Sequence, residues 1–445
     1  MSFPFRGLPP IRHPGPPPAS CDVVVLGGGV VGVMTAWHLA ERGVRVVLCE
    51  KGRIAAEQSG RNWGWIRQQG RDPAELPIMI ESLGLWKSLA HAFGEALGFR
   101  QTGVMYLART EAEMAGFEDW MTHARAHDLD TRMLSATAVG HHIKGQGGWI
   151  GGLYTPSDAR AEPWVAVPML ARGAVARGAA IVEHCAIRAL DLAAGRVAGV
   201  ITEAGRIACA QVVVAGGVWS RLFLGAHGIR IPQLSVLASV AATGPMPEIF
   251  AGNAADDTFA FRRRADGGYT LAPGAEHDFW PGRDAVTSFR SFLPILKKEF
   301  RSTHFRPLAP RGYPDAWTTP RHWSPDRESP FERMRILDPA PNMTTLSRVQ
   351  DAFARAFPAL GRPRLRAAWG GMIDIMPDIV PVIDRAPLPG LTIATGMSGH
   401  GFGIGPGLGR VVADLVTGNH PGHDLTRFRL SRFSDGSVVT LRPGL

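Results

Sequence analysis

Three glycines near the start of the chain have the spacing of a dinucleotide-binding turn. Gly27, Gly29 and Gly32 form G-x-G-x-x-G within VVVLGGGVVGVMTAWHLAERGVRVVLCE, which runs from Val23 to Glu50. In such a turn the first glycine permits the tight bend, the second lets the backbone approach a pyrophosphate, and the third lets helix and strand pack closely. These residues therefore predict the binding of an anionic dinucleotide.

The elements around the glycines complete this expected site. The apolar run Val23–Leu26 predicts a strand, and the helix after it points its positive end and free N–H groups at the phosphates. A second strand, Val44–Cys49, delivers Glu50 about 20 residues after the glycines, where an acid accepts a hydrogen bond from a ribose 2′-hydroxyl. An acid there disfavours a 2′-phosphate, so NADP is not expected.

FAD and NAD share this element, so the choice between them depends on later segments. Residues 51–72, KGRIAAEQSGRNWGWIRQQGRD, are small and polar where an NAD domain would continue into its next helix and strand. Ala208–Gly217 predicts another strand that ends in small residues, and residues 391–416 predict a strand, a glycine-dense loop and a helix. We therefore expect one sheet assembled from three separated segments, with an inserted second domain.

Length, composition and charge narrow the class of protein. A chain of 445 residues exceeds one ordinary core, and its 45% hydrophobic and 20% charged residues are typical of a globular protein. No apolar stretch reaches the roughly 20 residues of a membrane helix, and the proline-rich start lacks the apolar core of a secretory signal. The net charge of +9 comes from dispersed arginines. It indicates attraction of an anionic cofactor or a carboxylate substrate, not a nucleic-acid partner.

The four cysteines do not indicate a metal site. Cys21, Cys49, Cys185 and Cys209 lack metal-ligand spacing and fall on or beside predicted strands. We expect them to be reduced and packed, as in a cytoplasmic protein.

In combination the motifs resemble the D-amino acid oxidase-like FAD oxidoreductases, which include sarcosine, glycine and D-amino acid oxidases and dehydrogenases. The resemblance covers roughly residues 20–425. It rests on the Gly27–Gly32 turn with Glu50, on SGRNWG, on VVVAGGVWS, on W-G-G-x-x-D-x-x-P-D from Trp369, and on SGHGFGIGPG. It implies an α/β fold, α+β overall, with a Rossmann-like FAD-binding domain built from three segments and a substrate domain with an antiparallel β-sheet.

The resemblance also implies the residues that contact FAD. Ser59–Asn62 would lie beside the pyrophosphate and ring, Ile187 beside adenine, and Trp219 in the cofactor groove. The complete expected cofactor-binding set is Gly27, Gly29, Val30, Val31, Gly32, Glu50, Lys51, Ser59, Gly60, Arg61, Asn62, Trp63, Gly64, Ile187, Ala215, Gly216, Trp219, Gly371, Gly396, Ser398, Gly399, His400, Gly401 and Phe402.

The loop Gly396–Phe402 is expected along the edge of the isoalloxazine ring. A helix beginning near Gly405 would aim its N-terminal dipole at this loop. Backbone N–H groups there would stabilise the negative charge of reduced flavin near N1 and C2=O. His400 is a candidate base, but we expect its backbone to contribute more than its ring. The family mostly needs no dedicated base, because hydride leaves a carbon that bears a neutral amine.

Two departures from the family pattern carry information. Sarcosine-oxidase relatives attach flavin through a cysteine upstream of the P-D pair, whereas no cysteine follows Cys209 here, so we expect non-covalent FAD. Many amino-acid-oxidising relatives carry an arginine where this chain has Ile373, followed by Asp374. Isoleucine cannot pair a carboxylate, so either the substrate lacks one at that point or another cation binds it. Asp374 could hold a substrate cation, or could equally be a turn or capping acid.

The candidate cations are Arg262, Arg61 and Arg67. Arg262 lies in FAFRRRADGGYTLAPG. The alternation of residue types along this stretch predicts two antiparallel strands around the turn at residues 266–268. Arg262 and Arg264 would share a face of that hairpin. Ile373, Asp374, His400 and Arg262 are thus the candidate catalytic residues. Trp63 and Trp65 could roof the ring or cage an amine, although core packing is the more common use of such residues.

The expected domains follow from these segments. Residues 1–19 form a proline-rich arm, residues 20–90, 150–225 and 355–425 the FAD-binding domain, residues 91–149 and 226–354 the substrate domain, and residues 426–445 a surface extension. The substrate domain includes helices near residues 111–129 and Val286–Phe300.

The leading functional prediction is oxidation of a C–N bond in an amine or amino acid. Hydride would pass to flavin N5, the imine would hydrolyse, and oxygen would accept the electrons. One alternative is a dehydrogenase that passes electrons to a quinone or partner subunit. Another is a flavin-binding subunit of a hetero-oligomeric complex, and a homo-oligomer is also open.

Overall fold

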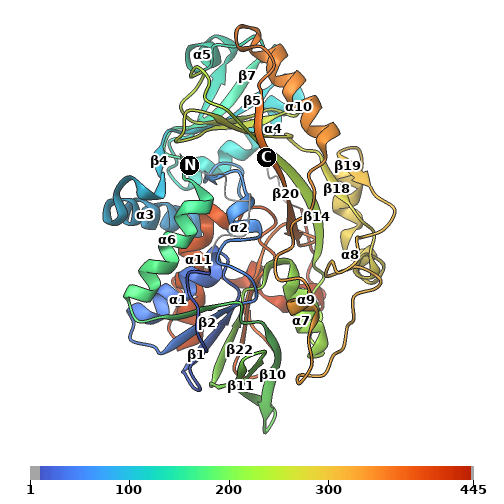
Figure 1. Cartoon of the computed structure of the whole chain (residues 1–445). Coiled ribbons are helices and arrows are strands. Elements are labelled where there is room, and N and C mark those ends of the chain that lie inside the picture. The colour runs from blue at the N-terminus through green and yellow to red at the C-terminus, as the bar shows by residue number, and fades with distance from the viewer. Residues whose placement is uncertain (1–10, 442–445) are drawn as a thin grey trace.

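Two large sheets organise the computed structural model, which describes residues 11–441 (Figure 1). The first has six strands and is parallel except for its edge strand β21. In spatial order its strands are β21 (Val382–Arg385), β22 (Leu391–Thr395), β13 (Gln211–Val214), β1 (Val23–Leu26), β2 (Val46–Glu50) and β9 (Ala180–Glu183). Segments far apart in sequence therefore share one sheet, as predicted.

Both faces of the six-stranded sheet are covered, which explains why its strands are continuous apolar runs. Val23 and Val25 of β1 pack against helices, whereas Val24 packs against a second layer of strands. The helices on the first face are α1 (Val30–Glu41), α3 (Leu76–Phe93), α6 (Pro163–Ala176) and α11 (Gly401–Thr417). On the second face lie β10 (Ile187–Ala193), β11 (Arg196–Thr202), β12 (Gly205–Ala208) and α7 (Ser220–Ala226).

The second large sheet has ten strands and is antiparallel except for the pairs β5–β15 and β18–β19. Its strands are β5 (Val104–Ala108), β6 (Arg132–Ser135), β7 (Gly151–Thr155), β14 (Leu234–Thr243), β15 (Asn253–Ala255), β16 (Ala260–Arg263), β17 (Tyr269–Ala272), β18 (His277–Phe279), β19 (Thr303–Phe305) and β20 (Leu365–Ile375). The predicted hairpin is β16–β17, and the turn between them contains Gly267.

The remaining elements surround these sheets. A small sheet joins β3 (Trp65–Ile66), β8 (Ala159–Arg160) and β4 (Arg100–Gln101). The other helices are α2 (Gln58–Arg61), α4 (Glu111–Ala126), α5 (Ala136–His142), α8 (Arg283–Glu299), α9 (Pro330–Arg333) and α10 (Met343–Ala356). Within residues 11–441 no helix is long and apolar enough to cross a membrane. The four cysteines are buried and free.

Two expected domain boundaries require correction. Strand β7 lies in the segment 150–225 and β20 in the segment 355–425, both assigned from sequence to the FAD-binding domain, yet both strands pair in the ten-stranded sheet. Sequence periodicity identifies a strand but does not say which sheet it joins.

The chain ends also differ from expectation. Residues 1–10 of the expected arm and 442–445 of the expected extension lie outside the described residues. The backbone N–H groups of Arg12 and His13 bond to Glu183. Near the other end Phe428 is buried, and Arg432 forms a buried ion pair with Asp378. Residues 426–441 are thus anchored by a packed aromatic and a charge pair, and do not form a simple surface extension.

The expected role of Arg262 at the substrate site is not supported by its position. Its guanidinium is fully buried and forms two hydrogen bonds to Glu162, at 2.8 and 3.0 Å. Arg264 shares its face, as the alternation predicts, since both guanidinium groups lie near the Trp164 ring. Because Glu162 pairs both Nη1 and Nη2 of Arg262, this arginine joins the start of α6 to the large sheet.

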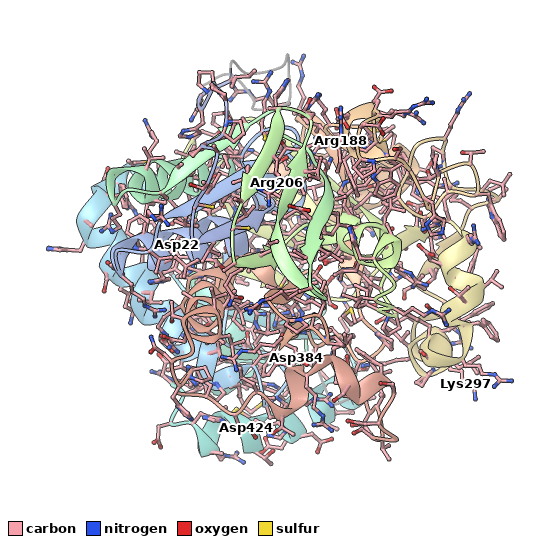
Figure 2. The ribbon with its side chains drawn as sticks, turned by 90° about the horizontal axis from the view of Figure 1, so that it is seen from below. Asp22, Arg188, Arg206, Lys297, Asp384 and Asp424 are labelled. Atoms are coloured by element: carbon pink, nitrogen blue, oxygen red, sulfur yellow. The ribbon has the colours of Figure 1, made fainter. Side chains whose placement is uncertain are left out.

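We therefore expect Arg262→Met to destabilise the fold strongly. It would leave the carboxylate of Glu162 buried without its partner, at a cost of about 3 kcal/mol in the free energy of unfolding. Arg206→Met is the control, since Arg206 on β12 lies at the surface (Figure 2) and its side chain is half exposed. Its pair with Asp191 should contribute less than about 1 kcal/mol. Denaturant unfolding of both variants measures the difference, and equal midpoints would contradict the structural role of Arg262.

Candidate active site

One cavity of about 440 Å³ is lined by residues from both large sheets. Its walls come from the β1–α1 turn, the end of β2, the segment 53–71, the end of β13, β20 and the loop before α11. The volume falls within the range of small-molecule sites. The three glycine-bearing segments identified in the sequence thus meet at the same cavity.

Close backbone approach explains two glycines of the first turn. Gly27 has a φ of +109°, and a Cβ there would lie 2.4 Å from the carbonyl oxygen of Ala215. A Cβ on Gly32 would lie 2.1 Å from the carbonyl oxygen of Gly27. The tight bend and the close helix packing predicted for these positions are therefore both present, and larger residues would force β1, α1 and β13 apart.

Glu50 extends from the end of β2 toward the glycine turn. Its two carboxylate oxygens accept N–H bonds from Gly28 and Gly52, each at 2.7 Å. Burial raises the pKa of Glu50 to about 7, although these bonds and Lys51 act in the opposite direction. Each oxygen retains acceptor capacity, so the carboxylate can receive ribose hydroxyls.

A second acid beside the cavity, Glu57, was missed in the sequence analysis. Glu57 accepts hydrogen bonds from Lys51 Nζ at 2.7 Å and from Trp219 Nε1 at 3.0 Å, while Lys51 lies over the Trp219 ring. Glu57 thereby fixes two residues that the resemblance places at the cofactor. Glu57 belongs to no recognisable motif, so the sequence offered no signal for it.

The segment after Glu57 is held by its own side chains. Ser59 Oγ accepts the N–H of Val30 at the start of α1, at 2.9 Å. Arg61 donates to the carbonyls of Ala56 and Gly370 and pairs with Asp338, so this candidate cation already has partners. The segment is consequently rigid where it borders the cavity.

Asp374 lies within β20 and occupies neither a turn nor a helix cap. Its Oδ2 accepts hydrogen bonds from Gly396 N–H at 2.8 Å and from Gln233 Nε2 at 2.9 Å. Burial raises the pKa of Asp374, opposed by the Gly396 N–H. Asp374 therefore connects β20 to the loop after β22 and is neither a turn nor a capping acid. Asp374 also lines the cavity, and its Oδ1 has no partner among residues 11–441, so a contact with a substrate cation stays a prediction.

The loop before α11 lines the cavity and is shorter than predicted. Helix α11 begins at Gly401, four residues before the predicted start near Gly405, and His400 precedes its first turn. Ser398 has a φ of +48°, and its Oγ accepts the N–H of Met376. The positive end of α11 therefore faces the cavity directly at Gly401.

A cluster of two arginines, one histidine and one glutamate borders the cavity beside this loop. His400 Nε2 lies 3.3 Å from Arg67 Nη2, and its Nδ1 lies 3.4 Å from Glu75 Oε2. Arg71 donates to the backbone carbonyl of His400 at 3.0 Å. Burial, followed by the charge of Arg71, lowers the pKa of His400 to about 4, so its ring is neutral near pH 7.

Most of the predicted site residues line this cavity, and a few do not. Those that line it are Gly27, Gly29, Val30, Val31, Glu50, Lys51, Ser59, Arg61, Asn62, Trp63, Ile187, Ala215, Gly216, Trp219, Gly371, Ile373, Asp374, Ser398, Gly399, His400, Gly401 and Phe402. Gly32, Gly60, Gly64 and Gly396 are not lining residues: a Cβ on the first three would meet backbone oxygens, and one on Gly396 would meet the Met376 side chain. Arg262 is paired elsewhere.

The cavity also contains lining residues that the sequence analysis did not select. They include Arg53, Gln58, Arg71, Tyr106, Val240 and Ala255. The last three come from the ten-stranded sheet, and only the three-dimensional pairing brings them beside the flavin motifs. Arg53 was detectable in principle, because it lies only three residues after Glu50 and therefore close to the expected ribose contact.

Unpartnered polar atoms in the wall fit a polar ligand. Arg53 Nε and Nη1, Trp65 Nε1 and Asp374 Oδ1 are buried without a hydrogen-bond partner among residues 11–441. Leaving such groups unsatisfied is costly, so a ligand with several donors and acceptors is expected there. FAD has both, and the acid at Glu50 and the helix start at Val30 suit its ribose and pyrophosphate.

Comparison with known proteins finds relatives over nearly the whole chain. The chain is 27% identical over 440 residues to sarcosine oxidase subunit beta of Rhizobium meliloti (strain 1021), covering 97% of this chain and 92% of the relative. Mitochondrial sarcosine dehydrogenase of Mus musculus is 24% identical over 431 residues, and the match spans 94% of this chain but 42% of that longer protein. The solved structure of L-amino acid deaminase from Proteus myxofaciens in complex with anthranilate superposes with a TM-score of 0.90, 31% identity and 95% coverage of each chain.

A family model described as FAD dependent oxidoreductase (DAO) matches residues 22–415. This range includes the glycine turn, Glu50, β20 and the start of α11, so it contains every wall of the cavity. The chain therefore belongs to the DAO family of FAD-dependent oxidoreductases.

Proposed function

We propose that the protein oxidises the C–N bond of an amino acid or N-substituted amino acid whose carboxylate is held by Arg67. The observation that carries this proposal is the cation at the cavity wall. Arg67 lines the cavity, and it forms no ion pair with a carboxylate among residues 11–441. The other two candidates are already paired, Arg61 with Asp338 and Arg262 with Glu162.

The charge of the surrounding cluster supports an anionic ligand. Arg67 and Arg71 carry two positive charges, His400 is neutral, and Glu75 supplies one negative charge. Burial opposes ionisation of Glu75, but the bond from His400 and the neighbouring positive charges leave its pKa below the ordinary value. The cluster therefore has an excess of one positive charge, which a single substrate carboxylate would balance.

The rest of the substrate end is aromatic and apolar. Trp63, Trp65 and Tyr106 stand edge to face beside the cavity, and Val240 and Ala255 contribute aliphatic surface. Such a wall suits a substrate with an apolar side chain. The Proteus deaminase was solved with anthranilate, an aromatic carboxylate with an amino group, which is consistent with that chemical class.

In the proposed reaction the chain positions the substrate and excludes water. Bound FAD supplies the acceptor for two electrons, which arrive as hydride from the carbon that bears the amine. Arg67 orients the carboxylate, and the aromatic residues restrict the side chain and displace water. Backbone N–H groups at the start of α11 face the cavity at Gly401, where they would stabilise developing negative charge. The imine leaves and is hydrolysed in water.

Oxygen is the electron acceptor in the leading form of this proposal. A second form, transfer to a quinone or a partner subunit, is favoured by relatives named as a dehydrogenase and as a subunit beta. Peroxide formation compared with dye reduction separates the two forms, and copurification would reveal a partner subunit.

The general proposal is tested by anaerobic reduction of the purified holoenzyme. We expect a yellow protein that releases FAD on acid denaturation and whose flavin is bleached by amino acids or N-methyl amino acids. Primary amines of the same side chain but without the carboxylate should reduce it at least tenfold less efficiently, because they lack the contact to Arg67. A colourless protein that takes up no FAD on reconstitution, or equal reduction by acids and amines, would oppose the proposal.

Substitution of Arg67 tests the carboxylate contact itself. We expect Arg67→Gln to raise KM for the best carboxylate substrate by about tenfold to a hundredfold, the usual effect of losing a charged hydrogen bond. KM for the corresponding amine should change by less than about twofold. Arg206→Gln, at an exposed arginine, is the control for general loss of charge. Steady-state kinetics of the three proteins on both substrates decide the point.

Substitution of Glu50 tests the expected ribose contact. We expect Glu50→Gln to weaken FAD binding to the apoprotein by about tenfold, measured by quenching of flavin fluorescence. Since the pKa of Glu50 is about 7, ribose hydroxyls favour its ionised form, and the affinity of the wild type should rise between pH 6 and 8. That rise should be absent in the variant, while Glu41→Gln on α1 should retain it.

Ionisation of Glu50 should favour FAD binding but disfavour folding of the apoprotein. The pKa of Glu50 is raised by burial, so the folded apoprotein retains a proton between about pH 4.5 and 7 that the unfolded chain has lost. The contribution of Glu50 to stability therefore falls as the pH rises through this interval. A pH dependence of opposite sign that is absent from Glu50→Gln would contradict the assignment.

A further inference from the structure

We propose that Glu75 is a positioning residue that orients the His400 ring, and that His400 in turn holds Arg67 toward the substrate. This inference rests on the proposed function, because it concerns the residue that would bind the substrate carboxylate. Glu75 itself is not among the residues that line the cavity. It immediately precedes α3, whereas His400 immediately precedes α11, so the contact joins the starts of two packed helices.

The order of the three side chains favours one tautomer of the His400 ring. An ionised carboxylate can only accept and a guanidinium can only donate. Arg67 Nη2 donates to Nε2 at 3.3 Å, so Nε2 presents its lone pair and the His400 ring carries its proton on Nδ1. That N–H lies 3.4 Å from Glu75 Oε2, an electrostatic contact without hydrogen-bond geometry. The opposite tautomer would place an N–H against the positive charge of Arg67. The carboxylate of Glu75 therefore determines whether His400 attracts or repels Arg67.

Arg71, the other charged neighbour, does not orient the His400 ring in place of Glu75. Arg71 donates Nη2 to the His400 carbonyl and Nε to the Arg67 carbonyl, so it fixes both backbones but not the imidazole ring. Its Nη1 lies 3.6 Å from Glu75 Oε2, which supplies charge but not a close hydrogen bond. Glu75 is 1% exposed and Arg71 2% by side chain, so water does not substitute for either contact. The ring of His400 consequently depends on Glu75 for its orientation.

A purely structural role for Glu75 is the competing explanation, since it could merely neutralise Arg71. That role would affect stability and FAD retention, but not the preference for a carboxylate over a neutral ligand of the same shape. The preference is therefore the decisive quantity. Anthranilate and 2-aminobenzamide form a suitable probe pair, because they differ only in the replacement of a carboxylate by an amide.

The experiment measures the Kd of each probe for the holoenzyme from the change in flavin absorbance. We expect Glu75→Gln to weaken anthranilate binding by about tenfold, because an amide can donate to Nδ1 and no longer enforces one tautomer. Binding of 2-aminobenzamide should change by less than about twofold. Glu41→Gln is the matched control, since Glu41 lies 3.3 Å from His38 in a similar pair on α1, away from the cavity.

Two substitutions of His400 keep the test decisive if Glu75→Gln does not retain FAD. His400→Gln preserves an oxygen that can accept from Arg67, whereas His400→Leu does not. We expect anthranilate to bind about tenfold more tightly to the first than to the second, with equal binding of 2-aminobenzamide. Equal anthranilate affinity in these two variants would overturn the positioning role.

The outcomes also separate this inference from the proposed function. If wild-type protein does not prefer anthranilate to 2-aminobenzamide, or if Arg67→Gln leaves that preference unchanged, the carboxylate site itself is refuted. If Arg67→Gln abolishes the preference but Glu75→Gln and His400→Leu preserve it, the carboxylate site stands and the role of Glu75 is refuted. Loss of the preference in all three variants supports both.

Discussion

The carboxyl group of Asp374 connects the two large sheets beside the cavity, whose walls come from both sheets. It lies on β20 of the ten-stranded sheet and accepts the N–H of Gly396, which follows β22 of the six-stranded sheet. Gln233, just before β14, donates to the same oxygen. A buried carboxyl group with several donors is held firmly, because breaking one contact leaves a buried polar atom unsatisfied. This contact thus helps to set the distance between β20 and the loop after β22, together with the bonds from Gln233 to Thr395 and from Met376 to Ser398.

Local sequence predicted the elements whose reasons lie within a few residues. The turn at Gly27 with its strand, helix and Glu50 is contiguous, and each residue type follows from a steric or hydrogen-bonding need. The start of α11 was misplaced, because glycines normally disfavour helices. Here tertiary packing prevails: a Cβ on Gly405 would lie 2.6 Å from the Val30 side chain, and one on Gly409 would lie 2.5 Å from Met34. Those glycines let α11 lie close against α1.

Pairing between distant residues could not be predicted in the same way. Arg262 is 100 positions from Glu162, and no local sequence pattern predicts their hydrogen bond. Strands β7 and β20 read as strands, but their membership in the ten-stranded sheet depends on partners far along the chain. Glu57 and Glu75 stand in polar segments without a motif, and their roles emerge only from the side chains brought beside them. The sequence thus indicated the cofactor end of the site better than the substrate end.

The isoleucine at position 373 acquires a physical explanation from this arrangement. Ile373 lines the cavity but carries no charge, so this position of β20 provides no cation to pair with a substrate carboxylate. The excess positive charge instead lies on the segment after β3, at Arg67 and Arg71, beside the start of α11. An arginine added at position 373 would bring another cation into the same cavity and would repel this cluster unless a second anion were present. The uncharged residue at position 373 and the basic segment after β3 therefore belong together: in the proposed site, one substrate must fit both.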